Sequence, residues 1–77
     1  MPIDSKLIFL IAKHFNLKQK DVNLNTSKDL IEDWDSLEHI KLILEIEEEF
    51  KIKFPLDVVP NIISVRAIKN EIEKLKV

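Results

Sequence analysis

A serine at the start of a predicted helix is the side chain of this sequence best placed to take part in chemistry. Ser36 follows the acidic residues Asp33 and Asp35 and precedes a stretch, 37–50, whose apolar spacing predicts a helix. A hydroxyl at the first position of a helix points away from the core and lies beside unpaired backbone N–H groups. No general base accompanies Ser36, so we expect another enzyme to modify it and expect no catalytic residue in the chain. The alternative is that Ser36 only caps the helix.

The residues that could bind a metal ion are poorly arranged for that purpose. The acidic side chains just before Ser36 are Asp29, Glu32, Asp33 and Asp35. A calcium-binding loop also needs a glycine at its turn and a glutamate at its end, a pattern that this stretch lacks. His14 and His39 fall on separate predicted helices without an i,i+4 partner, so we expect both to face solvent. We therefore expect no metal site.

The composition excludes several classes of protein. With 77 residues, the chain is predicted to form one domain, 1–77, with a small core and no deep cleft between domains. The absence of cysteine excludes disulfides and thiolate chemistry, and the absence of glycine excludes the phosphate-binding loops that need close backbone approach. The apolar run 7–12 is too short to span a bilayer, and no small-residue cleavage site follows it. We therefore expect a cytoplasmic protein.

Acidic charge is concentrated in the middle of the chain. Residues 21–50 contain ten acidic and two basic residues, whereas the segments on either side are each net positive. A field of negative sign repels nucleic acid and anionic lipid, and it attracts basic protein surfaces toward Ser36. We expect partners to be proteins with basic docking surfaces, and no binding to nucleic acid or membrane. The alternative is that an acidic helix serves only solubility.

Apolar periodicity predicts helices and no strands. The first helix is predicted to be capped by Asp4 or Ser5 and to end near Asn16, and a long connection then runs to Asp35. The second helix opens with Asp35 and Glu38 in the spacing of a capping box, in which Glu38 reaches back to the backbone of Asp35. Its predicted core-facing residues are Leu37, Ile40, Ile43, Leu44 and Phe50, with Leu42 and Ile46 beside them.

The last third of the sequence predicts a short helix and a longer one. Pro55 ends the preceding structure, and 56–60 can form only a short helix. Ser64 is predicted to cap a final helix whose apolar residues are Val65, Ile68, Ile72 and Leu75. The fold predicted from these elements is all-α, a small four-helix bundle with a long first loop and a short third helix.

Two motifs at a characteristic distance resemble those of the acyl carrier proteins. The sequence Asp35-Ser36-Leu37 is followed by Ile46-Glu47-Glu48-Glu49-Phe50 and then by Pro55, and the likeness covers nearly the whole chain. In that family the serine carries a 4'-phosphopantetheine arm, which a phosphopantetheinyl transferase takes from coenzyme A. The thiol of the arm holds acyl groups as thioesters. The resemblance implies that Ser36 is the attachment site and that the chain is a monomeric, non-enzymatic carrier, the substrate of the transferase and of acyl-transfer enzymes.

The resemblance also implies a docking surface on the second helix. Matched by position, its residues are Asp35, Leu37, Glu38, Glu47 and Glu48, which would meet basic patches on acyl-loading and acyl-using enzymes. Lys41 stands where an acidic residue is usual, and Trp34 stands where a small residue is common. Lys51 replaces a frequent glycine, so the second helix is expected to end less sharply.

The cargo and pathway stay open at this level. Fatty-acid biosynthesis and specialised acyl or polyketide-type biosynthesis both fit, as does an aminoacyl or peptidyl carrier. An acidic helical protein-interaction module without a prosthetic group is the alternative from another class. In the family the bundle can shelter an acyl chain, and the residues expected to line such a space are Leu42, Ile43, Ile46, Val59, Ile62, Ile63 and Ile68. Ordinary core packing explains the same residues.

Overall fold

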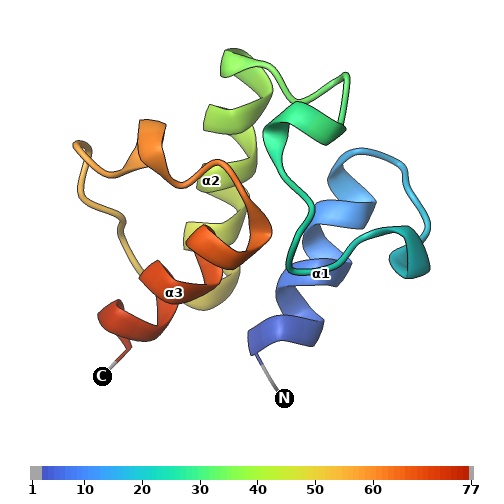
Figure 1. Cartoon of the computed structure of the whole chain (residues 1–77). Coiled ribbons are helices and arrows are strands. Elements are labelled where there is room, and N and C mark those ends of the chain that lie inside the picture. The colour runs from blue at the N-terminus through green and yellow to red at the C-terminus, as the bar shows by residue number, and fades with distance from the viewer. Residues whose placement is uncertain (1–2, 77) are drawn as a thin grey trace.

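The computed structural model describes residues 3–76, and its regular structure is helical (Figure 1). Three α-helices are present in this range: α1 (Ile3–His14), α2 (Ser36–Phe50) and α3 (Val65–Leu75). Single 3₁₀ turns lie at Gln19–Asp21, Lys28–Leu30 and Val59–Asn61. The predicted all-α fold holds for the described residues. The short helix predicted at 56–60 is wrong as placed, because that region forms turns and only the 3₁₀ turn at Val59–Asn61 is helical.

The helices α1 and α2 end in left-handed residues that are not glycine. Asn16 and Lys51 have φ values of 57° and 56°, the region that favours glycine. After α1, the Leu17 N–H donates to the Ala12 carbonyl at 2.7 Å, and after α2 the Ile52 N–H donates to the Glu47 carbonyl at 3.1 Å. Such bonds satisfy carbonyl groups left open at a helix end. The prediction that α2 ends less sharply because of Lys51 is therefore wrong.

The helix starts agree with the sequence in two cases of three. Asp35 accepts a hydrogen bond from the Glu38 N–H at 2.9 Å, and Ser64 accepts one from the Ala67 N–H at 3.1 Å, so both predicted caps are confirmed. The prediction that Glu38 bonds back to the Asp35 backbone is wrong, because the Glu38 carboxylate contacts the side chains of His14 and Lys41 instead. The cap predicted at Asp4 or Ser5 is also wrong, because α1 already begins at Ile3.

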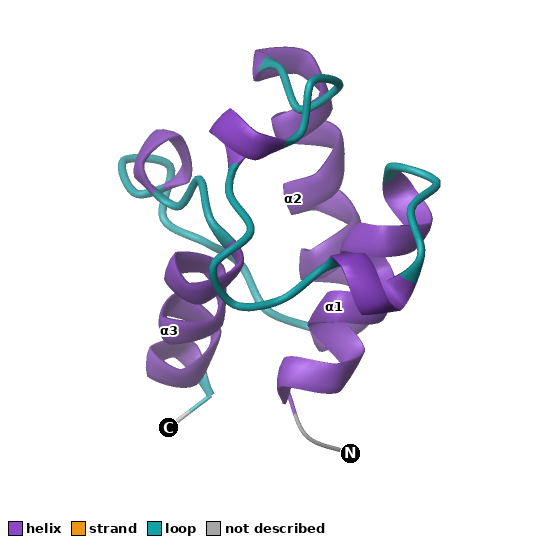
Figure 2. Ribbon diagram, turned by 45° about the vertical axis from the view of Figure 1, so that its right-hand side comes forward, coloured by secondary structure: helices purple, strands orange, loops and turns teal. Residues whose placement is uncertain are grey.

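One hydrophobic core joins the three helices. Helix α1 packs against both α2 and α3 (Figures 1 and 2). The connection 17–35 runs from the end of α1 to the start of α2 and lies beside the start of α3 on the way. Trp34, at the end of that connection, is only 2% exposed and contributes the largest fully buried side chain. The fully buried aliphatic residues of the same core are Leu7, Ile11, Leu42, Ile46, Val65, Ile68 and Ile72. Burial of this apolar surface is the main force that holds the helices together.

The face of α2 that packs on the core differs from the predicted one. Leu37, Ile40 and Leu44 are 61%, 53% and 59% exposed, so the prediction that they face the core is wrong. The buried residues of α2 are His39, Leu42, Ile43, Ile46 and Phe50. Apolar residues cover most of the circumference of this helix, and periodicity alone does not show which part meets α1. The consequence is an exposed apolar strip of three residues, Leu37, Ile40 and Leu44.

The connection 17–35 is held against the start of α3 by backbone hydrogen bonds. The Lys28 N–H donates to the Ile63 carbonyl at 2.8 Å, and the Val65 N–H donates to the Thr26 carbonyl at 2.9 Å. This pairing places Lys28 beside the segment that precedes α3. Within residues 3–76 no helix is both long enough and apolar enough to cross a lipid bilayer.

Candidate functional site

Ser36 is exposed at the first position of α2, and its side chain has no hydrogen-bond partner among the described residues. Asp35 has extended backbone angles and accepts from the Glu38 N–H, so Asp35 and not Ser36 is the N-cap. Among residues 3–76, no side chain or backbone group forms a hydrogen bond with the Ser36 hydroxyl. The interpretation of Ser36 as only a helix cap is therefore wrong. Its hydroxyl is accessible to another molecule.

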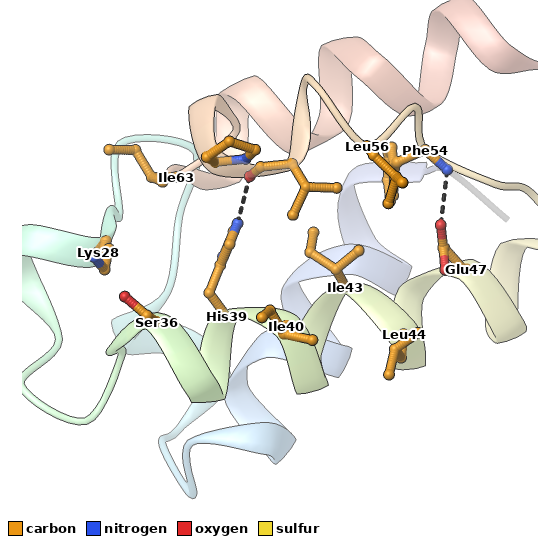
Figure 3. A pocket seen from close by; sticks show the side chains of 12 residues that line it. Lys28, Ser36, His39, Ile40, Ile43, Leu44, Glu47, Phe54, Leu56 and Ile63 are labelled. Atoms are coloured by element: carbon orange, nitrogen blue, oxygen red, sulfur yellow. Dashed lines mark hydrogen bonds between the residues drawn. The ribbon is translucent and has the colours of Figure 1, made fainter.

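An apolar groove of about 400 Å³ begins at Ser36 and runs along α2 (Figure 3). One wall is formed by Ile40, Ile43 and Leu44 of α2. The opposite wall is the segment 54–63, which contributes Phe54, Leu56, Val59, Pro60 and Ile63. This volume lies in the range of small-molecule pockets, and such pockets are mostly apolar. The groove can therefore take a slender apolar ligand.

Lys28 and Ser36 lie at the same end of the groove, while Glu47 and Phe54 lie toward the other (Figure 3). Lys28 is half-buried, and it forms no ion pair with any residue in the part of the chain described. Lys28 therefore contributes a positive charge at the same end of the groove as the serine. No local pattern of residues indicates this arrangement, because it depends on the backbone pairing of Lys28 with Ile63, 35 positions away.

His39 is buried beneath the groove, and both of its ring nitrogens have partners. Its residue exposure is 5%. The Trp34 indole N–H donates to Nδ1 at 2.9 Å, and an indole N–H can only donate, so Nδ1 carries no proton. The other nitrogen, Nε2, then carries the proton and donates to the Val59 carbonyl at 2.7 Å. The prediction that His39 faces solvent is wrong, because Trp34 occupies the core and draws His39 in with it.

Glu47, at the other end of the groove, also forms a hydrogen bond with the backbone of the segment opposite α2. Its Oε2 accepts a hydrogen bond from the Phe54 backbone N–H at 2.8 Å (Figure 3). A bond from a backbone N–H to a carboxylate is charge-assisted and therefore stronger than one between neutral groups. Glu47 thus fixes the position of the chain after α2.

The carboxylates predicted to bind partners divide into engaged and free groups. Asp35 caps α2, and Glu38 contacts the Nε2 of His14 at 3.0 Å and the Lys41 ammonium at 3.4 Å. Glu47 holds Phe54, whereas Glu48 is exposed and has no polar contact with a side chain or loop among the described residues. Leu37, the apolar member of the set, is exposed. The role of these five residues in partner binding stays a prediction.

His14 connects the end of α1 to α2. Its two ring nitrogens lie 3.0 Å from Glu38 and 3.2 Å from Glu45, and its side chain is 8% exposed. The prediction that His14 faces solvent is therefore wrong. The His14 side chain and the two carboxylates do not form a metal site, and no group of three potential ligands within residues 3–76 is close enough to hold a metal ion.

The predicted lining of an internal apolar space is correct in part. Ile43, Val59 and Ile63 line the groove. The other four predicted residues, Leu42, Ile46, Ile62 and Ile68, are packed in the core and do not line it. The apolar space that Ile43, Val59 and Ile63 line is a groove at the surface of the core.

Comparison with known protein families and with curated protein sequences gives no match to this chain.

Proposed function

We propose that this chain is an acyl carrier protein, with a 4'-phosphopantetheine arm on Ser36 that carries acyl groups as thioesters. The observation that carries the proposal is the exposed, uncommitted hydroxyl of Ser36 at the mouth of an apolar groove. In this proposal the 3₁₀ turn at Val59–Asn61 takes the place of the short third helix of a four-helix carrier fold, beside the three α-helices. Delivery to enzymes of fatty-acid or specialised acyl biosynthesis, in the cytoplasm, is part of the proposal.

The surroundings of Ser36 fit a phosphodiester. The start of α2 offers backbone N–H groups and the positive end of the helix dipole, both of which favour an anion. Lys28 adds a cation that has no ion-pair partner within residues 3–76. The carboxylates of Asp33 and Asp35 would repel the negative charge of the phosphodiester, although the carboxylate of Asp35 already accepts a hydrogen bond from the Glu38 N–H. Lys28 and the helix start together offset the repulsion.

Ser36 is the acceptor of the attachment reaction and not its catalyst. Its Oγ forms a bond to phosphorus as the bond between that phosphorus and the nucleotide part of coenzyme A breaks. The hydroxyl proton must pass to a base of the transferase, because none of the described residues is hydrogen-bonded to Oγ. When attached, the arm supplies the thiol that holds the acyl group.

The groove supports an acyl cargo. Ile40, Ile43 and Leu44 face an apolar wall, and the removal of an alkyl chain from water is favourable in proportion to the area buried. The groove starts at the serine to which the cargo is tethered, so a bound chain loses little additional freedom. An aminoacyl or peptidyl cargo would use this surface less, because its polar groups would lose hydrogen bonds to water.

The decisive test is the intact mass of the purified chain after incubation with coenzyme A, Mg²⁺ and a broad-specificity phosphopantetheinyl transferase. We expect the native chain to gain one phosphopantetheine and the Ser36→Ala variant to gain none. Ser5→Ala is a matched control, because Ser5 is also an exposed serine near a helix start. No mass gain in a native chain shown to be helical by circular dichroism would refute the proposal.

A protein-interaction module without a prosthetic group is the second candidate. It is favoured by the exposed strip of Leu37, Ile40 and Leu44 on an acidic helix. Apolar residues that stay exposed together often mark a protein contact. A negative result in the loading experiment would make this candidate the leading one.

A further inference from the structure

Two hydrogen bonds connect α2 to segment 54–59, which forms the wall of the groove opposite α2 (Figure 3). His39 donates to the Val59 carbonyl at 2.7 Å, and Glu47 accepts from the Phe54 N–H at 2.8 Å. The two α2 residues are eight positions apart, which corresponds to about 12 Å along a helix, and Ile43 lies between them at the floor of the groove. The two bonds therefore stand near opposite ends of the groove.

Between the two hydrogen-bonded points, Val58 and Val59 are partly buried against the core, but residues 55–57 have few long-range contacts of their own. Leu56 is 89% exposed, and Pro55 and Asp57 are exposed as well. The hydrogen bonds within this stretch are local, such as the one from the Val58 N–H to the Pro55 carbonyl at 3.1 Å. The buried ring of Phe54 anchors one end, but a ring in the core does not fix the distance of the following backbone from α2. Segments with few long-range contacts open at low free-energy cost.

Both nitrogens of His39 and one carboxylate oxygen of Glu47 take part in hydrogen bonds. Glu47 directs a carboxylate oxygen to a backbone N–H, and His39 has partners on both nitrogens. No buried side-chain nitrogen or oxygen in the part of the chain described lacks a hydrogen-bond partner. Between its polar end at Lys28 and Ser36 and the carboxylate of Glu47, the groove therefore presents an apolar surface to a ligand, which is suited to an unbranched alkyl chain.

We propose that Glu47 and His39 are positioning residues that hold segment 54–59 against α2 and so limit the length of alkyl chain that the groove admits. The occupant is the alkyl part of an acyl group carried on Ser36, and in this respect the inference rests on the proposed function. Glu47, which the sequence suggested as a docking residue, thus acts on cargo selection. The hydrogen bond from the Phe54 N–H to the charged Glu47 carboxylate opposes the movement of segment 54–59 away from α2. Such movement is needed for the groove to admit a longer alkyl chain.

The first test uses the unmodified chain, so that it does not depend on loading of Ser36. Amide hydrogen exchange is followed at Phe54 in the native chain, in Glu47→Ala and in the neighbouring control Glu48→Ala. We expect exchange of the Phe54 N–H to become at least about tenfold faster in Glu47→Ala and to stay unchanged in the control. Glu47→Gln, whose amide oxygen can still accept, should remain close to the native chain.

The second readout is the binding of N-phenyl-1-naphthylamine, a neutral fluorescent probe, to the same unmodified variants. We expect Glu47→Ala to bind the probe several-fold more tightly than the native chain, because the wall can move aside, and Glu48→Ala to bind as the native chain does. If Glu47→Ala proves unfolded, Glu47→Asp shortens the side chain by one methylene and should change both readouts in the same direction. Native exchange at Phe54 or native probe binding in folded variants would overturn the proposal.

The third readout addresses cargo length directly in loaded chains. The melting temperature is measured for acyl groups of stepwise increasing length on Ser36. We expect stabilisation to stop increasing at a shorter chain in the native protein than in Glu47→Ala. The same limiting length in both proteins contradicts the proposal. Failure of Ser36 to be loaded is seen separately as a missing mass gain, so the two proposals fail in different experiments.

Discussion

At the residue scale, the contact between Trp34 and His39 explains how a polar side chain can lie in the core. The indole N–H, the imidazole and the Val59 carbonyl form a continuous hydrogen-bonded series, and the two rings stack with centroids 6.0 Å apart. Buried polar groups are tolerated only when their hydrogen bonds are made. The series joins the residue two positions before Ser36 to the outer wall of the groove.

Removal of the indole N–H should therefore be costly. We expect Trp34→Phe to lower the free energy of unfolding by about 2–4 kcal/mol, since it leaves the Nδ1 of His39 without a donor and opens a small cavity. Urea denaturation followed by circular dichroism measures the change. Phe9→Leu is a suitable control, because Phe9 is 45% exposed and its substitution should change stability by less than about 0.5 kcal/mol. A similar small change for Trp34→Phe would show that the series is not important for stability.

At the element scale, α2 is defined by its two ends. The extended backbone of Asp35 makes Ser36 the first residue of α2. The left-handed conformation of Lys51 makes Phe50 its last residue. The ammonium of Lys6 contributes to the second end, since it donates to the Glu49 carbonyl at 3.1 Å and lies 5.1 Å from the centre of the Phe50 ring. These ends keep Ser36 and Glu47 at the two ends of the groove.

The conformation of Lys51 predicts a stabilising substitution. A residue with a Cβ atom in the left-handed region has a cost of roughly 1 kcal/mol that glycine avoids. We expect Lys51→Gly to raise the free energy of unfolding by about 0.5–1 kcal/mol, measured by urea denaturation. Lys53→Gly is the matched control, because Lys53 does not have a positive φ, and it should be neutral or destabilising. An equal effect of both substitutions would exclude the left-handed conformation as the cause.

At the scale of the whole molecule, the distribution of charge determines how a partner approaches. The acidic residues of 21–50 belong to the connection and to α2, the elements that carry Ser36 and the groove. Three of the four predicted docking carboxylates are engaged within the chain, which leaves Glu48 as the free one among them. Exposed charges act together and mainly affect the rate of association.

A loading reaction guided by this charge should depend on salt. We expect kcat/KM for transfer of phosphopantetheine to decrease as NaCl rises from low to physiological concentration. Glu48→Lys should lower kcat/KM by about 2–5-fold at low salt, a size typical of an exposed charge pair. Glu73→Lys, at an exposed position on α3, is the matched control and should have little effect. Loading that is independent of salt would show that the acidic surface does not guide the transferase.

Features that depend on neighbouring residues could be predicted from the sequence. The helical periods, the caps at Asp35 and Ser64, and the exposed hydroxyl at the start of α2 all involve residues within one or two helical turns. The composition alone excluded disulfides and glycine-rich phosphate loops. These predictions succeeded because backbone preferences and capping bonds act over three or four positions along the chain.

The tertiary structure decided which surfaces meet. His39 reaches Val59 across 20 positions and His14 reaches Glu38 across 24, and no local pattern indicates either contact. The same is true of the position of Lys28 at the Ser36 end of the groove and of the exposed strip on α2, because both depend on how separate elements pack. A helix with apolar residues on most sides can bury any of several faces, and only the combined burial of all the elements selects one.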